Sequence, residues 1–184
     1  MILVLATANA GKLDELRVLL GARAFELRTA AELGIVLPEE TGTSYVANAR
    51  LKAEAVARAS GELALGDDTG LEVAMLGGAP GIATADFAAQ LGGWRAACEE
   101  LARRTGLHRG ADVRATLCCA LVLANPDGTH EIGEARIAGR LAWPPTNAPG
   151  LAAIFVPDPP ERLLADGVLV HRRRAFEQLT KLGR

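Results

Sequence analysis

Residues 2–20 read ILVLATANAGKLDELRVLL. Residues 2–6 form a continuous apolar run, which predicts a β-strand buried on both faces. Residues 12–20 carry leucines at helical spacing with polar residues between them, which predicts an α-helix. A loop of small and polar residues joins the two, so the chain opens as a strand, a loop and a helix.

The rest of the chain also mixes helical and strand patterns. Further helices are expected over residues 44–59, 91–104 and about 171–182, and further strands over 25–27, 63–65, 113–124 and 129–141. The turn signal at residues 125–128 predicts a hairpin between the last two strands. The glycine-containing stretches 66–70 and 77–81 interrupt apolar segments. The mixture predicts an α/β protein, with residues 1–184 as a single domain.

The composition is that of a soluble globular protein. The 184 residues are 49% hydrophobic and 23% charged, enough for one domain with a sizeable core or with two lobes. The net charge is −2 and the only tight basic cluster is 172–174, so no nucleic-acid partner is expected. Cys98 stands alone and Cys118 and Cys119 are adjacent, which is typical of buried thiols rather than a disulfide or metal framework.

No membrane or targeting segment is visible in the sequence. No stretch approaches the ~18 apolar residues that a membrane helix needs. The apolar N-terminus is about one strand long and lacks the basic start of a signal peptide. A cytoplasmic location without a membrane partner is therefore expected.

The first segment that suits chemistry is Thr7-Ala8-Asn9-Ala10-Gly11-Lys12. Backbone N–H groups at a helix N-terminus and the charge of Lys12 attract anions, and Thr7 and Asn9 add polar contacts. The segment lacks the GxxxxGK[ST] pattern of a Walker-type loop. It fits a phosphate-binding loop, and an ordinary helix start capped by Asn9 is the alternative.

The other two segments offer carboxylates and a cation. In Asp67-Asp68-Thr69-Gly70 the adjacent carboxylates repel unless a cation or donors compensate them. A carboxylate here could hold a hard cation such as Mg²⁺ or orient an attacking water, with Glu39 or Glu40 as a further ligand. A polar turn between strands is the alternative. His171-Arg172 could bind phosphate or stack on a base, or could be a solvated helix start.

Taken in order, these segments resemble the inosine/xanthosine triphosphate pyrophosphatase family, which hydrolyses non-standard purine triphosphates such as ITP, dITP and XTP. The likeness runs to about Ala138 and resumes at the C-terminus. It is carried by the family's T-x-N-x-x-K pattern at residues 7–12, E-E-T-G…N-A…K-A over 39–53, D-D-S-G-L over 67–71 with Thr69 in place of the serine, L-G-G-x-P-G over 76–81, and His171-Arg172.

The resemblance implies an elongated α/β fold, with a mixed sheet, flanking helices, a cleft between two lobes, and a homodimer. It also implies an Mg²⁺-dependent enzyme that converts a purine nucleoside triphosphate to the monophosphate and pyrophosphate. By position, it implies triphosphate contacts from Thr7, Asn9 and Lys12, a substrate contact from Thr69, metal ligands Glu39 and Asp68, a general base in Asp68, and base contacts from His171 and Arg172. We expect these residues to line one cleft.

The sequence departs from the family pattern where the base would be recognised. The family expects F-G-Y-D-P, whereas residues 149–155 read PGLAAIF. Leu151 and Ala152 therefore stand at the aromatic and acidic positions, and Asp166 stands where the family has a lysine. The phosphate and metal segments match the family, while the base-recognition segment is degenerate.

Two alternatives to the family's activity stay open. One is a non-catalytic nucleotide-binding relative, and the other is a pyrophosphatase with a shifted substrate range. Retention of Lys12, Glu39 and Asp68 together favours an enzyme, because a binding module has no need of a base beside a metal. The degenerate segment predicts weak discrimination among purine triphosphates or low turnover.

Overall fold

The computed structural model describes residues 1–21, 25–148, 150–160, 164–165 and 168–182. The helices are α1 (Ala10–Leu20), α2 (Tyr45–Ser60), α3 (Thr84–Gln90), α4 (Trp94–Thr105) and α5 (Val170–Phe176), with 3-10 turns η1 (Ala31–Leu33), η2 (Ala74–Leu76) and η3 (Gly150–Ile154). The strands are β1 (Ile2–Ala6), β2 (Glu26–Thr29), β3 (Leu63–Val73), β4 (Pro80–Gly81), β5 (Val113–Ala124), β6 (His130–Leu141), β7 (Phe155–Pro157), β8 (Leu164–Ala165) and β9 (Val168–Leu169).

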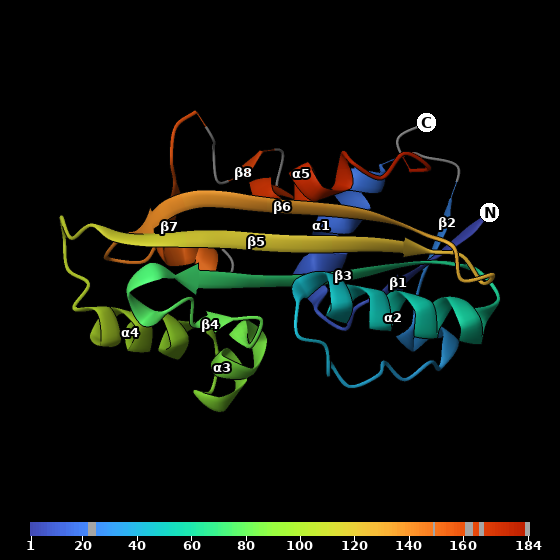
Figure 1. Cartoon of the computed structure of the whole chain (residues 1–184), viewed down its shortest axis with the longest axis horizontal. Coiled ribbons are helices and arrows are strands. Elements are labelled where there is room, and N and C mark those ends of the chain that lie inside the picture. The colour runs from blue at the N-terminus through green and yellow to red at the C-terminus, as the bar shows by residue number, and fades with distance from the viewer. Residues whose placement is uncertain (22–24, 149, 161–163, 166–167, 183–184) are drawn as a thin grey trace. The chain divides into compact units, whose positions relative to one another are not determined.

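Seven of the described strands form one mixed sheet in the order β2-β1-β3-β5-β6-β7, and β4 pairs with β3 off this path (Figure 1). The predicted α/β class with a mixed sheet is confirmed. The chain divides into two compact units. Unit 1 comprises Met1–Asp68, Cys119–Ala135 and Asp166–Arg184, and unit 2 comprises Thr69–Cys118 and Arg136–Ala165. The single domain and the cleft between lobes stay predictions.

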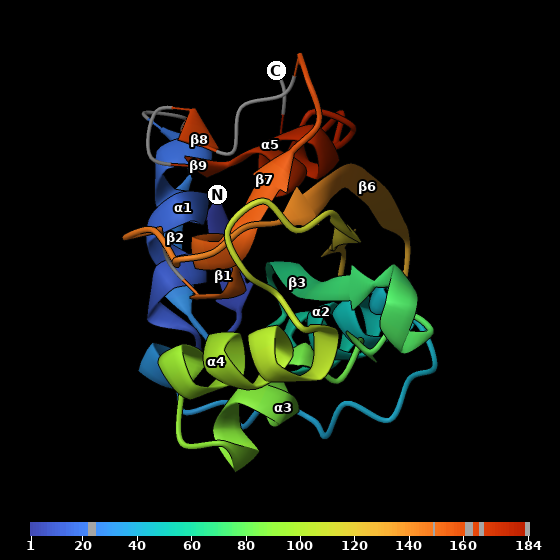
Figure 2. The same cartoon turned by 90° about the vertical axis from the view of Figure 1, so that its left-hand side faces the viewer.

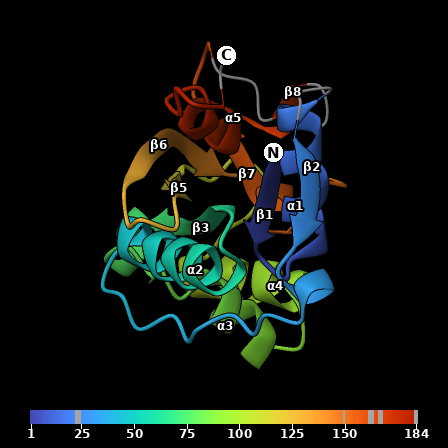
Figure 3. The ribbon, with the colours of Figure 1, turned by 90° about the vertical axis from the view of Figure 1, so that its right-hand side faces the viewer.

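Unit 1 is built on the parallel pairing of β1 with β2 and with the start of β3. Helices α1 and α5 lie on one face of these strands and α2 lies on the other (Figures 1 and 3). Leu3, Leu5, Leu63 and Leu65 belong to one buried cluster with leucines of α1 and residues of α5. Successive strand residues point to opposite faces, so the odd-numbered residues of β1 and of β3 up to Asp67 face α1 and α5.

The other face of β3 lies close to α2. A Cβ atom added to Gly66 would be 2.1 Å from the backbone oxygen of Ala49 in α2. This contact is far too short for any side chain, so glycine at this position permits the close packing of helix on strand. The even-numbered residues of β3 up to Asp68 therefore face α2.

Unit 2 contains the remaining helices. Helix α3 contacts α4, and η3 also packs against α4 (Figure 2). Strand β7 pairs antiparallel with β6, and β4 pairs antiparallel with β3. None of the described helices is long and apolar enough to cross a lipid bilayer. The prediction that Cys98, Cys118 and Cys119 are buried thiols is confirmed.

Three local predictions are wrong. The strand expected over 63–65 continues through residues 66–70 to Val73, so the alternative of a polar turn there is also wrong. The helix expected over 91–104 begins at Trp94, after Gly92 and Gly93 with φ values of 85° and 132°, and a separate helix α3 precedes it. The C-terminal helix ends at Phe176 rather than near 182.

Candidate active site

The loop between β1 and α1 is held by short-range hydrogen bonds. The Thr7 hydroxyl accepts a bond from the Asn9 N–H at 3.2 Å. The Asn9 side-chain oxygen accepts a bond from the Lys12 N–H at 3.2 Å and so caps the helix. The capped helix start is confirmed. It also sets Thr7, Asn9 and Lys12 at the positive end of the α1 dipole, where their role toward phosphate stays a prediction.

Asp67 points to the α1 and α5 face of β3 and is completely buried. It forms an ion pair with the Lys12 ammonium and accepts a hydrogen bond from Arg172 Nε at 2.7 Å. Burial alone would raise the pKa of Asp67, but the charges of Arg172 and Lys12 and their hydrogen bonds hold it well below its usual value. Asp67 is therefore an anion at any physiological pH.

Arg172 joins this anion to helix α1. Its Nη1 lies 2.7 Å from Glu15 Oε2, and the same carboxylate oxygen accepts a bond from the Leu169 N–H at 2.8 Å. Burial opposes its charge, yet Asp67 and Glu15 raise the pKa of Arg172 further above its usual value. Arg172 is 2% exposed, so the alternative of a solvated helix start is wrong. Its contact with a base stays a prediction.

Asp68 points to the α2 face and has different neighbours. Its Oδ2 accepts a bond from Asn48 Nδ2 at 3.2 Å, and Asn48 Oδ1 accepts one from the Gly42 N–H at 2.8 Å. Burial raises the pKa of Asp68 to about 6; the charges of Lys52 and Lys12 oppose this rise and that of Glu40 adds to it. The two adjacent aspartates are thus an ion-paired anion and a carboxyl that titrates near neutrality.

The loop ahead of α2 brings Glu40, rather than Glu39, into contact with this group. Glu40 Oε1 accepts a bond from the buried Lys52 Nζ at 2.7 Å, and its charge acts on Asp68. Both glutamates are exposed, and Glu39 forms no ion pair within the described residues. The assignment of Glu39 as a metal ligand stays a prediction, and Glu40 is a second candidate.

No cluster of three or more His, Cys, Asp or Glu side chains suited to a metal occurs in the described part of the chain. Mg²⁺ is often held by only one or two carboxylates, with substrate phosphates and water completing its shell. The chemistry of the donors fits this pattern, because the Asp68 carboxylate is buried and only partly compensated by its lysines. A nearby cation would relieve that cost.

His171 lies on α5 beside Arg172 and is fully buried. Neither ring nitrogen has a hydrogen-bond partner among the residues that the structure describes. Burial and the charges of Arg172 and Lys12 lower its pKa well below the usual value, against the opposing charge of Asp67. A buried polar group without a partner costs ~1 to 3 kcal/mol, so a ligand or water that hydrogen-bonds the neutral ring is expected here.

The predicted residues of unit 1 thus gather around β3. The charges of Lys12 and Asp67 act on His171, and the charge of Lys12 also acts on Asp68. Thr69 follows Asp68 on β3 and is half-buried, and its contact with substrate stays a prediction. The sequence interpretation assigned no role to Asp67, Glu15, Asn48 or Lys52, all of which contact the predicted residues or act on their charges.

The degenerate segment lies in unit 2. Leu151 and Ala152 are each 4% exposed within η3, which packs against α4. Gly150 has a φ of 60°, and an added Cβ would lie 3.6 Å from the Trp94 ring. Leu151 and Ala152 are therefore interior apolar residues. Asp166, the other departure from the family pattern, lies outside the described residues.

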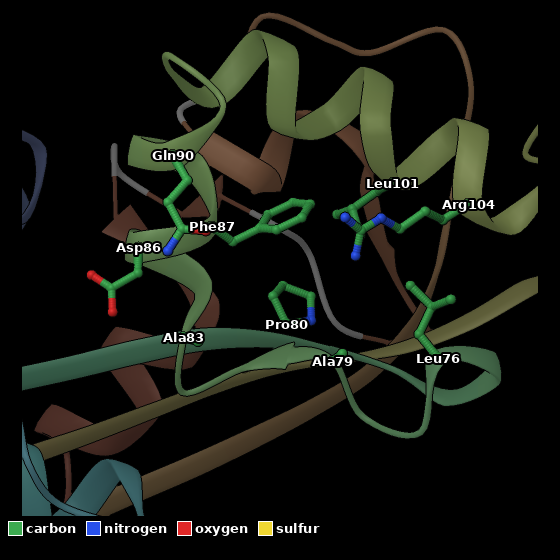
Figure 4. Close-up of a pocket in the computed structure, with 9 residues that line it drawn as sticks. All are labelled: Leu76, Ala79, Pro80, Ala83, Asp86, Phe87, Gln90, Leu101 and Arg104. Carbon is green, nitrogen blue, oxygen red and sulfur yellow. The ribbon is translucent and has the colours of Figure 1, made fainter.

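A separate pocket of about 280 Å³ lies within unit 2, between α3, α4 and the segment of η2 and β4 (Figure 4). The Phe87 ring lies inside it, with the Arg104 guanidinium 5.2 Å from the ring centre. None of the residues predicted to bind substrate or metal lines this pocket. It is therefore distinct from the group around β3.

Comparison with known proteins identifies relatives over nearly the whole chain. The chain is 42% identical over 163 residues to a dITP/XTP pyrophosphatase of Rhizobium meliloti (strain 1021), covering 84% of this chain and 76% of that protein. It is 39% identical over 198 residues to a dITP/XTP pyrophosphatase of Rhodopseudomonas palustris (strain ATCC BAA-98 / CGA009), covering 98% and 94%. These relatives confirm the resemblance on which the site residues were chosen.

Solved structures agree with the sequence comparison. A HAM1 protein from Coxiella burnetii superposes with a TM-score of 0.82 at 28% identity, covering 97% of this chain and 95% of that one. The Staphylococcus aureus Ham1 protein superposes with a TM-score of 0.79 at 28% identity, covering 96% and 95%. A sequence model of the Ham1 family matches residues 3–182. The chain therefore belongs to the Ham1 family.

Proposed function

We propose that this protein hydrolyses non-standard purine nucleoside triphosphates, such as ITP, dITP and XTP, to the monophosphate and pyrophosphate. Relatives that cover most of the chain are dITP/XTP pyrophosphatases. The observation that carries the proposal is the environment of Asp68. This buried carboxyl has a pKa raised to about 6, beside two lysines and a capped helix N-terminus.

Asp68 is suited to act as the general base. Without a bound cation, a pKa of about 6 leaves the carboxyl ionised at neutral pH yet more basic than an ordinary aspartate, and a bound cation would lower this pKa. The bond from Asn48 to Oδ2 fixes the orientation of the carboxylate. In this role Asp68 accepts the proton of a water that attacks the phosphoanhydride, and the pyrophosphate group leaves.

The phosphate chain would lie against the cations around Asp68. Lys12, 18% exposed at its side chain, and the N-terminus of α1 offer positive charge to phosphate oxygens. The neutral His171 ring offers one donor and one acceptor for a further polar group of the substrate. Fixed positive groups stabilise the charge that develops on the transferring phosphate without reorganisation.

We propose Asp68 and one carboxylate of the Glu39-Glu40 pair as ligands of a divalent cation such as Mg²⁺. Glu40 is favoured by its bond to Lys52 and its effect on Asp68. The cation would neutralise phosphate charge and polarise the phosphoanhydride when bound. Glu39 could exchange with Glu40, because the two share one loop.

The test is a pyrophosphate-release assay over ITP, dITP, XTP, ATP and GTP, with and without Mg²⁺. We expect release from the non-standard purines that depends on the cation and is lost in Asp68→Asn. A protein that binds ITP in calorimetry without releasing pyrophosphate would instead support the non-catalytic alternative.

A cytoplasmic homodimer without a nucleic-acid partner is also part of this proposal. It is supported by the resemblance to the family and by the net charge of −2. Light scattering on the purified protein would test the dimer. A monomer at micromolar concentration that releases pyrophosphate at full rate would contradict it.

A further inference from the structure

Four charged side chains from three elements meet on the α1 and α5 face of β3. Asp67 pairs with Lys12 and Arg172, and Arg172 pairs with Glu15. Two anions balance two cations, so the network is formally neutral. Asp67 occupies the centre, because it contacts both cations and is completely buried.

The Lys12 ammonium has one carboxylate partner in the described structure, and that partner is Asp67. A lysine side chain is flexible and loses much conformational freedom when it is held in one place. Asp67 can hold it, because Arg172 Nε donates to Asp67 at 2.7 Å and Arg172 is in turn fixed by Glu15 at 2.7 Å. The ammonium is thereby fixed close enough to Asp68 for its charge to act on that carboxylate.

We propose that Asp67 is a positioning residue, which holds the Lys12 ammonium where the triphosphate of the substrate binds. This inference rests on the proposed function for the identity of the ligand. Asp67 touches neither water nor phosphate in this role and acts only through Lys12. Binding groups must be held to within a fraction of an ångström, so loss of the anchor weakens catalysis even though Lys12 is still present.

A purely structural role makes a different prediction. If Asp67 only neutralised Arg172 and stabilised the fold, its loss would lower activity by the same factor whether or not Lys12 were present. If it acts through Lys12, its loss has little effect once Lys12 has been removed. A double-mutant cycle separates these cases.

The experiment compares wild type, Asp67→Asn, Lys12→Met and the double variant, by kcat/KM for ITP and by calorimetric affinity for inorganic tripolyphosphate. We expect Asp67→Asn alone to lower kcat/KM on the order of 10²-fold. In the Lys12→Met background we expect a further loss below ~3-fold. Equal losses in both backgrounds would overturn the proposal.

Glu15→Gln is the matched control. Glu15 is also a buried carboxylate that pairs with Arg172, but no ion pair joins it to Lys12 in the described residues. Its coupling to Lys12→Met should be weaker than that of Asp67→Asn, because Glu15 reaches Lys12 only through Arg172 and Asp67. Coupling of Glu15→Gln to Lys12→Met as strong as that of Asp67→Asn would mean general loosening of the network, and would overturn the specific role of Asp67.

Asp67→Asn leaves the network of Lys12, Arg172 and Glu15 with one uncompensated positive charge, and this variant could fail to fold. The double variant removes one charge of each sign, so the buried network is again formally neutral. The comparison of Lys12→Met with the double variant is therefore sufficient by itself to test the proposal. Equal activity and equal tripolyphosphate affinity support the proposal, and a large further loss contradicts it.

The two readouts separate this inference from the proposed function. Hydrolysis of ITP with additive losses would leave the proposed function standing and overturn the role of Asp67. Absence of hydrolysis in wild type, with tripolyphosphate affinity that shows the coupling, would support Asp67 as an anchor and overturn the proposed function. Absence of both hydrolysis and binding would overturn both.

Discussion

Asp68→Asn is expected to stabilise the ligand-free protein at neutral pH while it abolishes turnover. The Asp68 side chain is 5% exposed, and burial raises its pKa from 3.8 to about 6. Asparagine keeps the shape of the side chain, and its amide oxygen can accept the bond from Asn48 that Asp68 accepts. The substitution therefore removes the negative charge and the proton-accepting group and little else.

The sign follows from the direction of the pKa change. A folded-state pKa above the unfolded value favours folding of the protonated form, so stability is full below about 3.8 and falls as pH rises through about 6. The rise in the pKa of Asp68 from 3.8 to about 6 corresponds to a loss of about 3 kcal/mol in the free energy of unfolding when the group is ionised. Screening by water reduces the expected gain of Asp68→Asn to about 2 kcal/mol above pH 7.

Urea unfolding of both proteins at pH 4 and pH 8 measures this gain, and pyrophosphate release measures turnover. We expect nearly equal stabilities at pH 4, a more stable Asp68→Asn at pH 8, and a rate lowered by ~10² to 10⁴-fold. Asp67→Asn is the control of opposite sign, because the lowered pKa of Asp67 means that its charge stabilises the fold at pH 8. Lower stability of Asp68→Asn at pH 8 would contradict the cost assigned to the buried charge. Near wild-type pyrophosphate release would contradict the role of Asp68 as general base.

Glu40→Gln should lower kcat/KM by ~10 to 100-fold, and Glu39→Gln by much less, because only Glu40 contacts Lys52, the lysine beside Asp68. If a Mg²⁺ titration shows the larger loss of activity for Glu39→Gln, Glu39 is the ligand. Gly66→Ala should lower the free energy of unfolding by about 3 kcal/mol, because its Cβ would lie 2.1 Å from the Ala49 oxygen; an unchanged denaturation midpoint would disprove the close packing. ITP and XTP should exceed ATP and GTP in kcat/KM by less than ~200-fold, because Leu151 and Ala152, at the family's base-recognition positions, offer no side-chain hydrogen bond that would select the base; a preference of ~10⁴-fold would show that other residues recognise the base.

The start of the chain was predictable because local pattern and final structure agree there. The apolar run at residues 2–6 and the leucine spacing that follows gave β1 and α1, and Asn9 caps the helix as its residue type suggests. The strands at 113–124 and 130–141 were equally clear from their length and the turn between them. In these segments each residue's local preference points to the observed element.

The course of β3 was not predictable from local pattern. Residues 66–70 contain two glycines and two aspartates, which favour turns when they stand alone. In the structure Gly66 allows α2 to pack closely on the strand. Asp67 forms ion pairs with Lys12 of α1 and Arg172 of α5, which lie far away in the sequence. Such partners are invisible to a local pattern, although the alternation of strand side chains would have placed the two aspartates on opposite faces.

The sequence was sufficient to choose the residues of the candidate site, but not to predict the ion pairs among them. Family patterns located Lys12, Asp68 and His171, which lie near one another in unit 1. They did not reveal that Lys12 is ion-paired with Asp67, or that Arg172 is buried with its guanidinium on two carboxylates. Ion pairs between distant segments depend on packing, and the sequence could not show that Glu40, rather than Glu39, would contact Lys52.

The products formed from ITP show directly whether this protein is a nucleoside-triphosphate pyrophosphatase. Phosphorus NMR of a reaction with Mg²⁺ distinguishes pyrophosphate with IMP from orthophosphate with IDP. We expect pyrophosphate and IMP in equal amounts, formed only when a divalent cation is present and absent from the Asp68→Asn reaction. Orthophosphate and IDP as the first products, or unchanged ITP after prolonged incubation with Mg²⁺, would contradict it.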